Sequence, residues 1–281
     1  MDLKQLKVYK DFNTTKYLFE LNDGNGIETV CIRRRTGVTI CVSTQVGCAV
    51  RCAFCLSGQH GLIRNLTETE IVQQVFSVKE HINRIVFMGI GEPLHNYSSL
   101  LNSIHILRDR DGLNFPTEGI TISTVGPIAG LRKLREEHLK IQLVLSLHAT
   151  TQSVRNRLIP GMRHNKIEDT VKAVLSYSER HNRKITIAYL LLPGINDSIA
   201  DKKHLFQWFR DENVRINLFP LNKTIGHYPF ATQTQLRNFK KDLENAGLDV
   251  AIREARGKNI QAACGQLAIV RTTLCSKHWG C

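Results

Sequence analysis

Short apolar runs alternate with amphipathic stretches along most of this chain. The apolar runs read as strands and cover residues 38–43, 84–88, 119–124, 141–146, 184–192, 214–219 and 248–253. Helical stretches separate them, near residues 98–108, 127–138, 166–181, 199–211 and 232–246, and Gly247 stands where the last should end. This alternation predicts parallel strands joined by right-handed crossovers.

The clearest helix is expected from Ile71 to Ile82. Thr67 and Glu70 have the spacing of a capping box at its start. Apolar residues at helical spacing share one face of this stretch, namely Ile71, Val72, Val75 and Phe76. The pattern therefore predicts an amphipathic helix here.

Two further strands, residues 16–22 and 27–34, precede this alternation and are joined by Asp23-Gly24-Asn25-Gly26, which has hairpin-turn chemistry. Six or seven strand–helix units are too few for a closed eight-stranded barrel. We therefore predict an α/β fold, a partial, open (β/α)6 barrel behind a small N-terminal β extension. The expected divisions are the extension at 1–36, the core at 37–270 and a tail at 271–281. The tail carries Cys275, His278 and Cys281 and is interpreted as a mobile or tag-like end in preference to a metal site.

Composition narrows the class of protein. No run among the 281 residues approaches the ~18 apolar residues of a membrane span, and the first residues have no apolar signal-peptide core, so a cytoplasmic protein without a membrane partner is expected. Eight cysteines then favour metal or redox chemistry over a disulfide framework. The formal net charge of +13 favours a polyanionic partner, most plausibly RNA, and the densest basic run is Arg33, Arg34 and Arg35.

The loop after the first core strand carries Cys48, Cys52 and Cys55 in the spacing C-x-x-x-C-x-x-C. Three thiolates can hold three irons of a [4Fe-4S] cluster and leave the fourth iron open to an outside ligand. This spacing is the signature of radical-SAM enzymes, in which S-adenosylmethionine (SAM) fills the open position. The alternatives are three buried cysteines or a zinc knuckle, for which His60 is the nearest candidate fourth ligand.

Polar residues, a glycine and a leucine of interest follow several predicted strands, where the active sites of parallel α/β folds lie. They are Gly91, Glu92, Ser123, Ser146, Leu147, His148 and Asn222. Glycines let the backbone approach a ligand closely, and Glu92 is an anion that could meet an ammonium group. Each alone is more often a turn or a helix cap, but their shared edge favours a SAM pocket.

Three isolated residues add to this picture. Cys41 ends the first core strand, and Cys264 lies next to Gly265 far along the chain. A free cysteine is commonly a small buried hydrophobe, although the neighbouring glycine makes Cys264 look like a loop residue open to approach. Glu28 begins a strand and, read alone, would be a surface carboxylate.

Taken together, these features resemble the RlmN/Cfr family of radical-SAM RNA methyltransferases, which methylate an adenine carbon. The match runs from about Glu28 to Leu267 and rests on the four-cysteine spacing, MGIGEPLHN, STVG, SLHA and RGKNIQAACGQL. The resemblance implies that the cluster ligands are Cys48, Cys52 and Cys55. It implies SAM contacts from Gly91, Glu92, Ser123, Ser146, Leu147, His148 and Asn222. It also implies that Glu28 is the proton acceptor and that Cys41 and Cys264 are the catalytic cysteines.

The chemistry implied by the resemblance uses two SAM molecules per turnover. The first methylates Cys264, for which a thiolate is a competent nucleophile. The second is cleaved reductively at the cluster to a 5′-deoxyadenosyl radical, which takes hydrogen from the S-methyl group so that the carbon adds to adenine. Cys41 then forms a transient disulfide with Cys264 and releases the product, while Glu28 removes the proton from the adenine carbon.

One departure concerns the substrate. Family members usually carry a small helical domain ahead of the barrel, and the early position of Glu28 leaves no room for it. RNA docking would then fall on the barrel, on Arg33–Arg35 and on Arg163, His164 and Lys166. We expect methylation of rRNA or tRNA, at C2 in preference to C8, by a monomer supplied with electrons by a donor such as flavodoxin. The alternatives are the same chemistry on a small molecule or peptide, and a non-catalytic RNA-binding relative.

Overall fold

The structure, a computed structural model, describes residues 3–222, 228–268 and 270–271. The main sheet contains β1 (Lys4–Asp11), β2 (Thr14–Glu20), β3 (Asn25–Arg34), β4 (Gly37–Cys41), β7 (Ile82–Phe87), β8 (Ile120–Thr124), β9 (Gln142–Ser146), β10 (Ile185–Leu191), β11 (Val214–Pro220), β12 (Val250–Ile252) and β13 (Val270–Arg271). The helices are α1 (Glu68–Phe76), α2 (Tyr97–Arg108), α3 (Ile128–Glu136), α4 (Gln152–Leu158), α5 (Ile167–His181), α6 (Ile199–Phe209) and α7 (Gln233–Asn245). A separate two-stranded sheet pairs β5 (Gln45–Gly47) with β6 (Leu62–Asn65).

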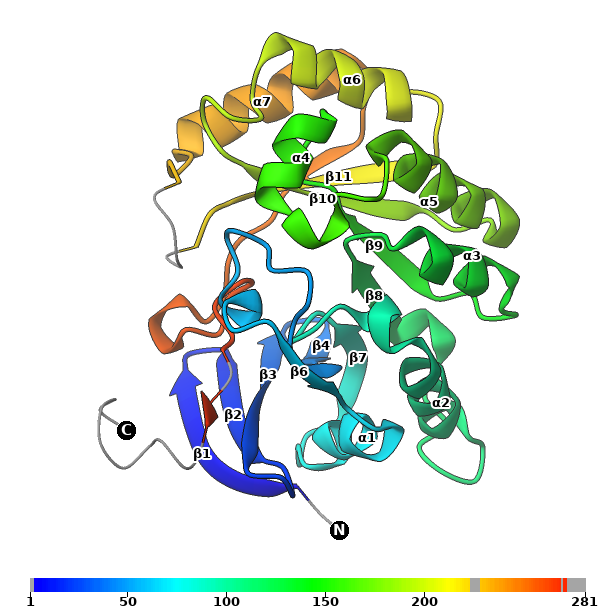
Figure 1. The fold of residues 1–281 in the computed structure, drawn as a ribbon, viewed down its shortest axis with the longest axis vertical. Coiled ribbons are helices and arrows are strands. Elements are labelled where there is room, and N and C mark those ends of the chain that lie inside the picture. The colour runs from blue at the N-terminus through cyan, green and yellow to red at the C-terminus, as the bar shows by residue number, and fades with distance from the viewer. Residues whose placement is uncertain (1–2, 223–227, 269, 272–281) are drawn as a thin grey trace.

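The parallel part of the sheet has the order β4-β7-β8-β9-β10-β11-β12, so strands adjacent in the sheet follow one another along the chain. Helices lie along the outer side of this curved sheet (Figure 1). One face of these strands is apolar and buried; Ile185, Ile187 and Tyr189 of β10, for example, are each 0% exposed. The other face also carries polar side chains, such as Thr121 of β8, Gln142 of β9 and Asn217 of β11, which line a pocket. The predicted partial (β/α)6 barrel is confirmed.

The N-terminal extension is antiparallel and continues the same sheet in the order β1-β2-β3-β4. The β2–β3 hairpin was expected, and at its turn the Asn25 amide donates to Asp23 Oδ1 at 3.0 Å while Gly24 has φ +76°. The sequence pattern did not identify β1. This edge strand, KQLKVYKD, has no fully buried residue, so no apolar periodicity marks it.

Helix α1 is shorter than expected. Thr67 and Glu70 do form the predicted capping box, but the helix ends at Phe76, and Ile82 opens β7. Of the four residues predicted to share a face, Ile71, Val72 and Val75 are buried, whereas Phe76 is 58% exposed. Phe76 is therefore not part of the buried face, because at 3.6 residues per turn it lies at the edge of the face that the other three residues form.

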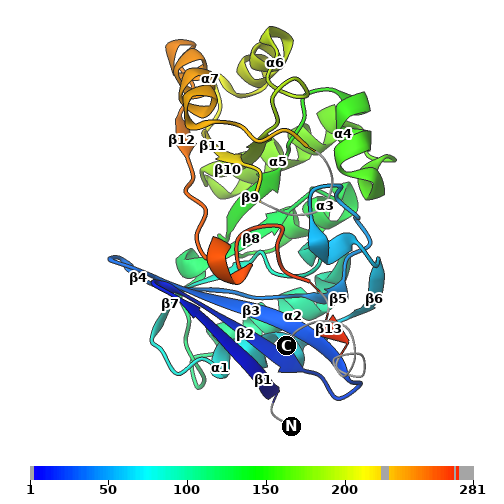
Figure 2. The same cartoon turned by 90° about the vertical axis from the view of Figure 1, so that its left-hand side faces the viewer.

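After β12 the chain turns back across the open side of the barrel toward the extension. Residues 253–268, called here the return segment, end beside β13, whose Val270 pairs with Gly26 of β3. Figure 2 shows this segment descending from β12 toward β3. It brings residues near the end of the chain over the first strands. Cys275, His278 and Cys281 lie outside the described residues.

No helix in the described part of the chain is long and apolar enough to cross a membrane.

Candidate active site

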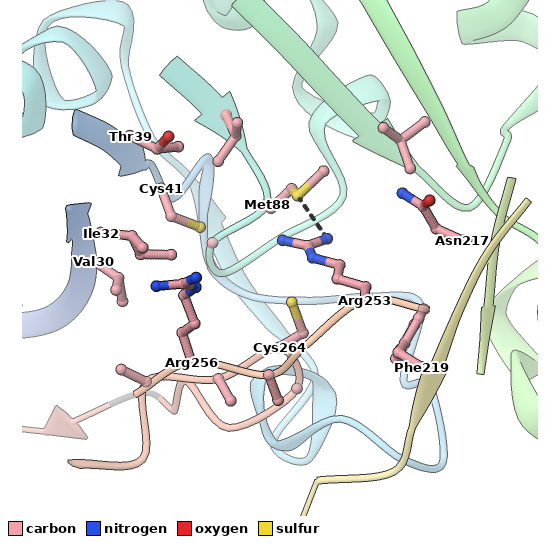
Figure 3. A pocket seen from close by; sticks show the side chains of 18 of the residues that line it. Val30, Ile32, Thr39, Cys41, Met88, Asn217, Phe219, Arg253, Arg256 and Cys264 are labelled. Carbon is pink, nitrogen blue, oxygen red and sulfur yellow. Dashed lines mark hydrogen bonds between the residues drawn. The ribbon is translucent and has the colours of Figure 1, made fainter. Parts of the chain in front are cut away.

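A pocket of about 420 Å³ lies between the barrel strands, the cysteine loop and the return segment. Its lining includes the predicted reaction-site residues Cys41, Cys55, Asn222 and Cys264, together with Arg34 of the basic run. Its walls also take side chains from β3, β7, β8, β9, β10 and β11. Residues from almost the whole length of the chain therefore meet around one space (Figure 3).

Cys41 and Cys264 face this pocket from different elements. Cys41 comes from the end of β4, where it pairs with Val30 on one side and Val86 on the other. Burial, and next the nearby Cys264, raise the pKa of the Cys41 thiol to about 12. Cys264 is exposed on the return segment, and Figure 3 shows both sulfur atoms at the pocket. The structure thus brings together two thiols that are 223 residues apart in sequence; both are free.

Cys48, Cys52 and Cys55 gather on one loop. Burial raises the pKa of Cys48 to about 12, and the pKa of Cys52 is raised by burial and by the charges of Cys55 and Cys48. No three His, Cys, Asp or Glu side chains of the described residues are placed to hold one metal ion. In a [4Fe-4S] cluster each thiolate binds a different iron, so its ligands need not converge on one point. The three thiols fit three ligands of such a cluster.

The return segment holds the cysteine loop in place. The Leu56 amide donates to the Gly265 carbonyl oxygen at 2.8 Å, and Ser57 Oγ donates to the Leu267 carbonyl oxygen at 2.7 Å. On the other side, Asn222 Nδ2 donates to the Cys264 carbonyl oxygen at 3.0 Å. The position of Cys264 is therefore coupled to the cysteine loop and to the end of β11.

His148 is a packing residue between the cysteine loop and two strands. Its ring makes edge contacts with Phe54 at 5.0 Å and Phe219 at 5.6 Å between centroids. Its Nδ1 atom accepts a hydrogen bond from the Leu190 amide at 3.0 Å. Burial, and secondarily Arg155, lower the pKa of His148 to about 3, so the imidazole is neutral.

The Glu92 carboxylate is already engaged by the neighbouring strand end. It accepts hydrogen bonds from Thr124 Oγ1, from the Val125 amide at 2.9 Å and from the Leu94 amide at 3.0 Å. Burial raises the pKa of this carboxyl to about 7, against the effect of these hydrogen bonds. Glu92 therefore ties the end of β7 to the end of β8, and contact with an ammonium group stays a prediction.

The other expected SAM contacts lie at the ends of successive strands, although among them only Asn222 lines the described pocket. Ser123 and Ser146 are half-buried near the ends of β8 and β9, and Leu147 is fully buried. Gly91 has φ +109°, and a Cβ there would lie 2.7 Å from Gln45 Cβ, so a side chain would strain this turn. The Oδ1 atom of Asn222 is buried and has no hydrogen-bond partner among the described residues.

Sequence reasoning missed Arg155. This side chain on α4 is fully buried, and its guanidinium donates to the backbone carbonyl oxygens of Val125, Ser146 and Leu147. It lies near enough to Cys52 and Glu92 for their charges to raise its pKa, although burial lowers it to about 10 overall. The hydrogen bonds of Arg155 thus join the end of β8 to the end of β9. The seven residues of α4 are mostly polar, so no apolar pattern indicated a buried position.

Lys16 was also missed, and it changes the interpretation of Glu28. Glu28 is buried on β3, where Lys16 Nζ lies 2.7 Å from its Oε1 atom and the Ala268 amide donates to Oε2 at 3.0 Å. Burial raises the pKa of Glu28, and the Lys16 charge opposes that rise. Glu28 shares a face of β3 with Val30 and Ile32, which line the pocket, but does not itself line it.

The basic run divides between two faces of β3. Arg33 points away from the pocket and is paired with Glu80 through Nε, at 2.7 Å, and through Nη2. Arg34 lines the pocket, and Arg35 is exposed. Period-two alternation along a strand explains this separation of neighbours. Glu80 already partners Arg33, and contact of Arg33, Arg34 and Arg35 with RNA stays a prediction.

Comparisons with known proteins agree with this site. The model of the Radical SAM superfamily matches residues 42–204. A "Probable RNA methyltransferase" of Rhodopseudomonas palustris (strain BisB5) is 54% identical over 253 residues, which are 90% of this chain and 70% of the relative. A "Probable dual-specificity RNA methyltransferase RlmN" of Thermotoga maritima is 42% identical over 96% of this chain and 80% of the relative.

Among solved structures, a radical SAM methyltransferase from Sphaerobacter thermophilus superposes with a TM-score of 0.90 at 35% identity, covering 94% of this chain and 81% of that one. Both the sequence and the fold therefore match well beyond the cysteine loop. This chain belongs to the radical SAM superfamily, whose members use a [4Fe-4S] cluster and SAM, and within it to the RlmN-type methyltransferases.

Proposed function

We propose that this protein methylates an adenine carbon of RNA, at C2, through a methyl-cysteine intermediate on Cys264. The observation that carries the proposal is the meeting of Cys41 and Cys264 at one pocket beside the three-cysteine loop. RNA binding alone requires no such pair of thiols. The net charge of +13 and the printed names of the relatives support RNA as the substrate. The proposed RNA is rRNA or tRNA.

Cys48, Cys52 and Cys55 are the proposed ligands of the [4Fe-4S] cluster. Bound together, the cluster and SAM would supply a 5′-deoxyadenosyl radical able to abstract a hydrogen atom, formed by reductive cleavage of SAM with an electron from a donor such as flavodoxin. The expected SAM contacts at the strand ends are Gly91, Glu92, Ser123, Ser146, Leu147, His148 and Asn222. Arg155 and Glu92 orient these strand ends through the hydrogen bonds described above.

Cys264 is the proposed methyl carrier. It is exposed on the return segment, so a methyl donor can approach its sulfur, and its carbonyl oxygen is held by Asn222. A thiolate is a competent nucleophile for methyl transfer from SAM. One SAM methylates Cys264 and a second is consumed in the radical step, which makes two per turnover.

Cys41 is the proposed resolving thiol. It faces the same pocket as Cys264. Attack of the Cys41 thiolate on the Cys264 sulfur would form the transient disulfide and break the bond from that sulfur to the methylene carbon on adenine. That carbon would keep the electron pair of the broken bond and take up a proton, which Cys41 has given up, to become the methyl group of the released base. Burial holds Cys41 as a protonated thiol until that step, because its pKa of about 12 is far above neutral pH.

Glu28 is the proposed proton acceptor. In this structure Lys16 and the Ala268 amide occupy its carboxylate, and Glu28 lies two residues before the lining residue Val30 on the same face of β3. Glu28 must therefore exchange at least one of these partners before it reaches an adenine carbon. Movement of the return segment, which carries Ala268, is the simplest route.

The test is anaerobic incubation of the cluster-reconstituted protein with methyl-labelled SAM, a reductant and total RNA, followed by mass spectrometry of nucleosides and of the Cys264 peptide. Label in 2-methyladenosine supports the proposal. Cys264→Ala is expected to remove all label from RNA, whereas Cys31→Ala, a buried cysteine outside the pocket, should leave labelling intact.

Other outcomes contradict parts of the proposal. Label in 8-methyladenosine would refute the choice of C2. Label on Cys264 with none in RNA would mean that the acceptor is a small molecule or peptide. No label on RNA or protein, from protein with an intact cluster, would overturn the methyltransferase function. A cytoplasmic location and a monomeric state are expected of this enzyme.

A further inference from the structure

Four arginines from separate parts of the chain line the same pocket. They are Arg34 of β3, Arg84 of β7, and Arg253 and Arg256 of the return segment. Figure 3 shows the side chains of Arg253 and Arg256 extending into the pocket near Cys264. One carboxylate, Glu254, lines the pocket with them, which leaves an excess of positive charge.

These guanidinium groups lack anionic partners in the described part of the chain. No ion pair there includes any of the four. Arg253 Nη1 is 3.9 Å from the sulfur of Met88, which is a weak acceptor. By contrast Arg33, the neighbour of Arg34, is paired with Glu80. Unpaired arginines that converge on a pocket indicate an anionic ligand.

The four positive charges repel one another. Burial lowers the pKa of Arg34, the charges of Arg256, Arg253 and Arg84 lower it further, and the charge of Glu254 opposes them. The four charges are therefore close enough to act on one ligand. An anion placed among them would relieve the repulsion.

Strand register gives the distance of this cluster from the catalytic cysteines. Cys41 pairs with Val86 of β7 and with Val30 of β3. Arg84 is two residues before Val86, and Arg34 is four residues after Val30; both offsets run in the same direction because β3 is antiparallel to β4. Measured along the strands, Arg84 is therefore roughly 7 Å and Arg34 roughly 13 Å from Cys41. The arginines thus extend from the cysteines toward the amino ends of the parallel strands.

We propose that Arg34, Arg84, Arg253 and Arg256 bind the RNA phosphates that flank the target adenosine while its base lies at Cys264. This inference rests on the proposed function, because it takes RNA as the substrate. A base that reacts inside a pocket must leave its stack, and contacts to the flanking phosphates hold the strand in that state. One guanidinium group can donate two parallel hydrogen bonds to the oxygens of one phosphate, which suits this role.

The test measures the affinity of a single-stranded, adenosine-containing RNA oligomer over a series of salt concentrations. Each lost phosphate contact is expected to reduce the slope of log K against log salt by about 0.7. The variants are Arg84→Met and Arg256→Met, which remove charge from opposite walls of the pocket. Arg84→Lys keeps the charge and should keep the slope, with weaker binding because the paired contact is lost. The matched control is Arg110→Met, an exposed arginine outside the pocket, which should leave affinity and slope unchanged.

The outcomes separate this inference from the proposed function. Unchanged slopes in both methionine variants, with native far-UV circular dichroism, would overturn the phosphate site even if the wild-type protein methylates RNA. Failure of the wild-type protein to bind the oligomer would also overturn it. Reduced slopes in a protein that transfers no methyl group would support the phosphate site and refute only the methylation.

Discussion

The ion pair between Lys16 and Glu28 offers the sharpest test of the electrostatics around the return segment. The two side chains are 7% and 6% exposed and 2.7 Å apart, so Lys16→Met leaves a buried carboxylate without its counter-ion. Such a loss costs about 3 to 5 kcal/mol if the charge stays. The carboxyl can avoid that cost by taking up a proton.

The free energy of protonating Glu28 sets how strongly the stability of Lys16→Met depends on pH. From an ordinary pKa of 4.5, protonating Glu28 at pH 7 costs about 3.4 kcal/mol, and at pH 5.5 about 1.4 kcal/mol. These free energies are upper limits, because the pKa of Glu28 is already raised in the native protein. A raised carboxyl pKa means that the folded state binds more protons than the unfolded state, so stability falls as pH rises from 4.5 toward the folded pKa. Lys16→Met should therefore lose up to about 2 kcal/mol more at pH 7 than at pH 5.5.

The assay is urea unfolding of wild type and variants at both pH values. Lys16→Met/Glu28→Gln removes the charge but keeps an oxygen for the Ala268 amide, so it should recover most of the loss. Lys4→Met is the surface control, because the Lys4–Glu20 pair is equally short but Lys4 is 72% exposed, and it should cost less than about 1 kcal/mol. Equal losses at the two pH values, or a double variant as unstable as Lys16→Met, would refute the reasoning.

Three further changes test the site. Gly58→Ala places a Cβ 2.7 Å from the Cα atom of Arg51, so the cysteine loop must shift and the iron and sulfide content of the protein should fall. In the control variant Gly112→Ala the new Cβ has no atom nearer than 3.6 Å, and the iron and sulfide content should stay unchanged. Arg155→Met removes the donors for carbonyl oxygens at two strand ends, and calorimetry should show a loss of about 3 kcal/mol, or about 5 °C in Tm; an unchanged Tm would contradict that role. Cys41→Ala should trap a covalent protein–RNA adduct, visible on a denaturing gel, and free turnover by this variant would rule out its proposed role.

The barrel was predictable from the sequence because each of its strands and helices carries its own periodic signal. Strands β7 to β12 each bury apolar side chains on one face, and the Thr67–Glu70 capping box marks the start of α1 from four residues alone. The cysteine loop is equally local, since the three predicted ligands lie within eight residues. Where the signal is local, propensity and pattern decide the structure before tertiary contacts form.

The tertiary structure alone decided features that join distant segments. The polar helix α4 carries the buried Arg155, and β1 is held by its pairing with β2. Lys16 contacts Glu28 because β2 and β3 are neighbours in the sheet. The four pocket arginines come from three separate segments, and Arg33 is excluded from them because adjacent strand residues face opposite sides. The sequence predicts the β2–β3 hairpin and the alternation of side chains along β3, but it does not predict which charged groups come together, because the energy of a buried charge depends on which groups the fold places against it.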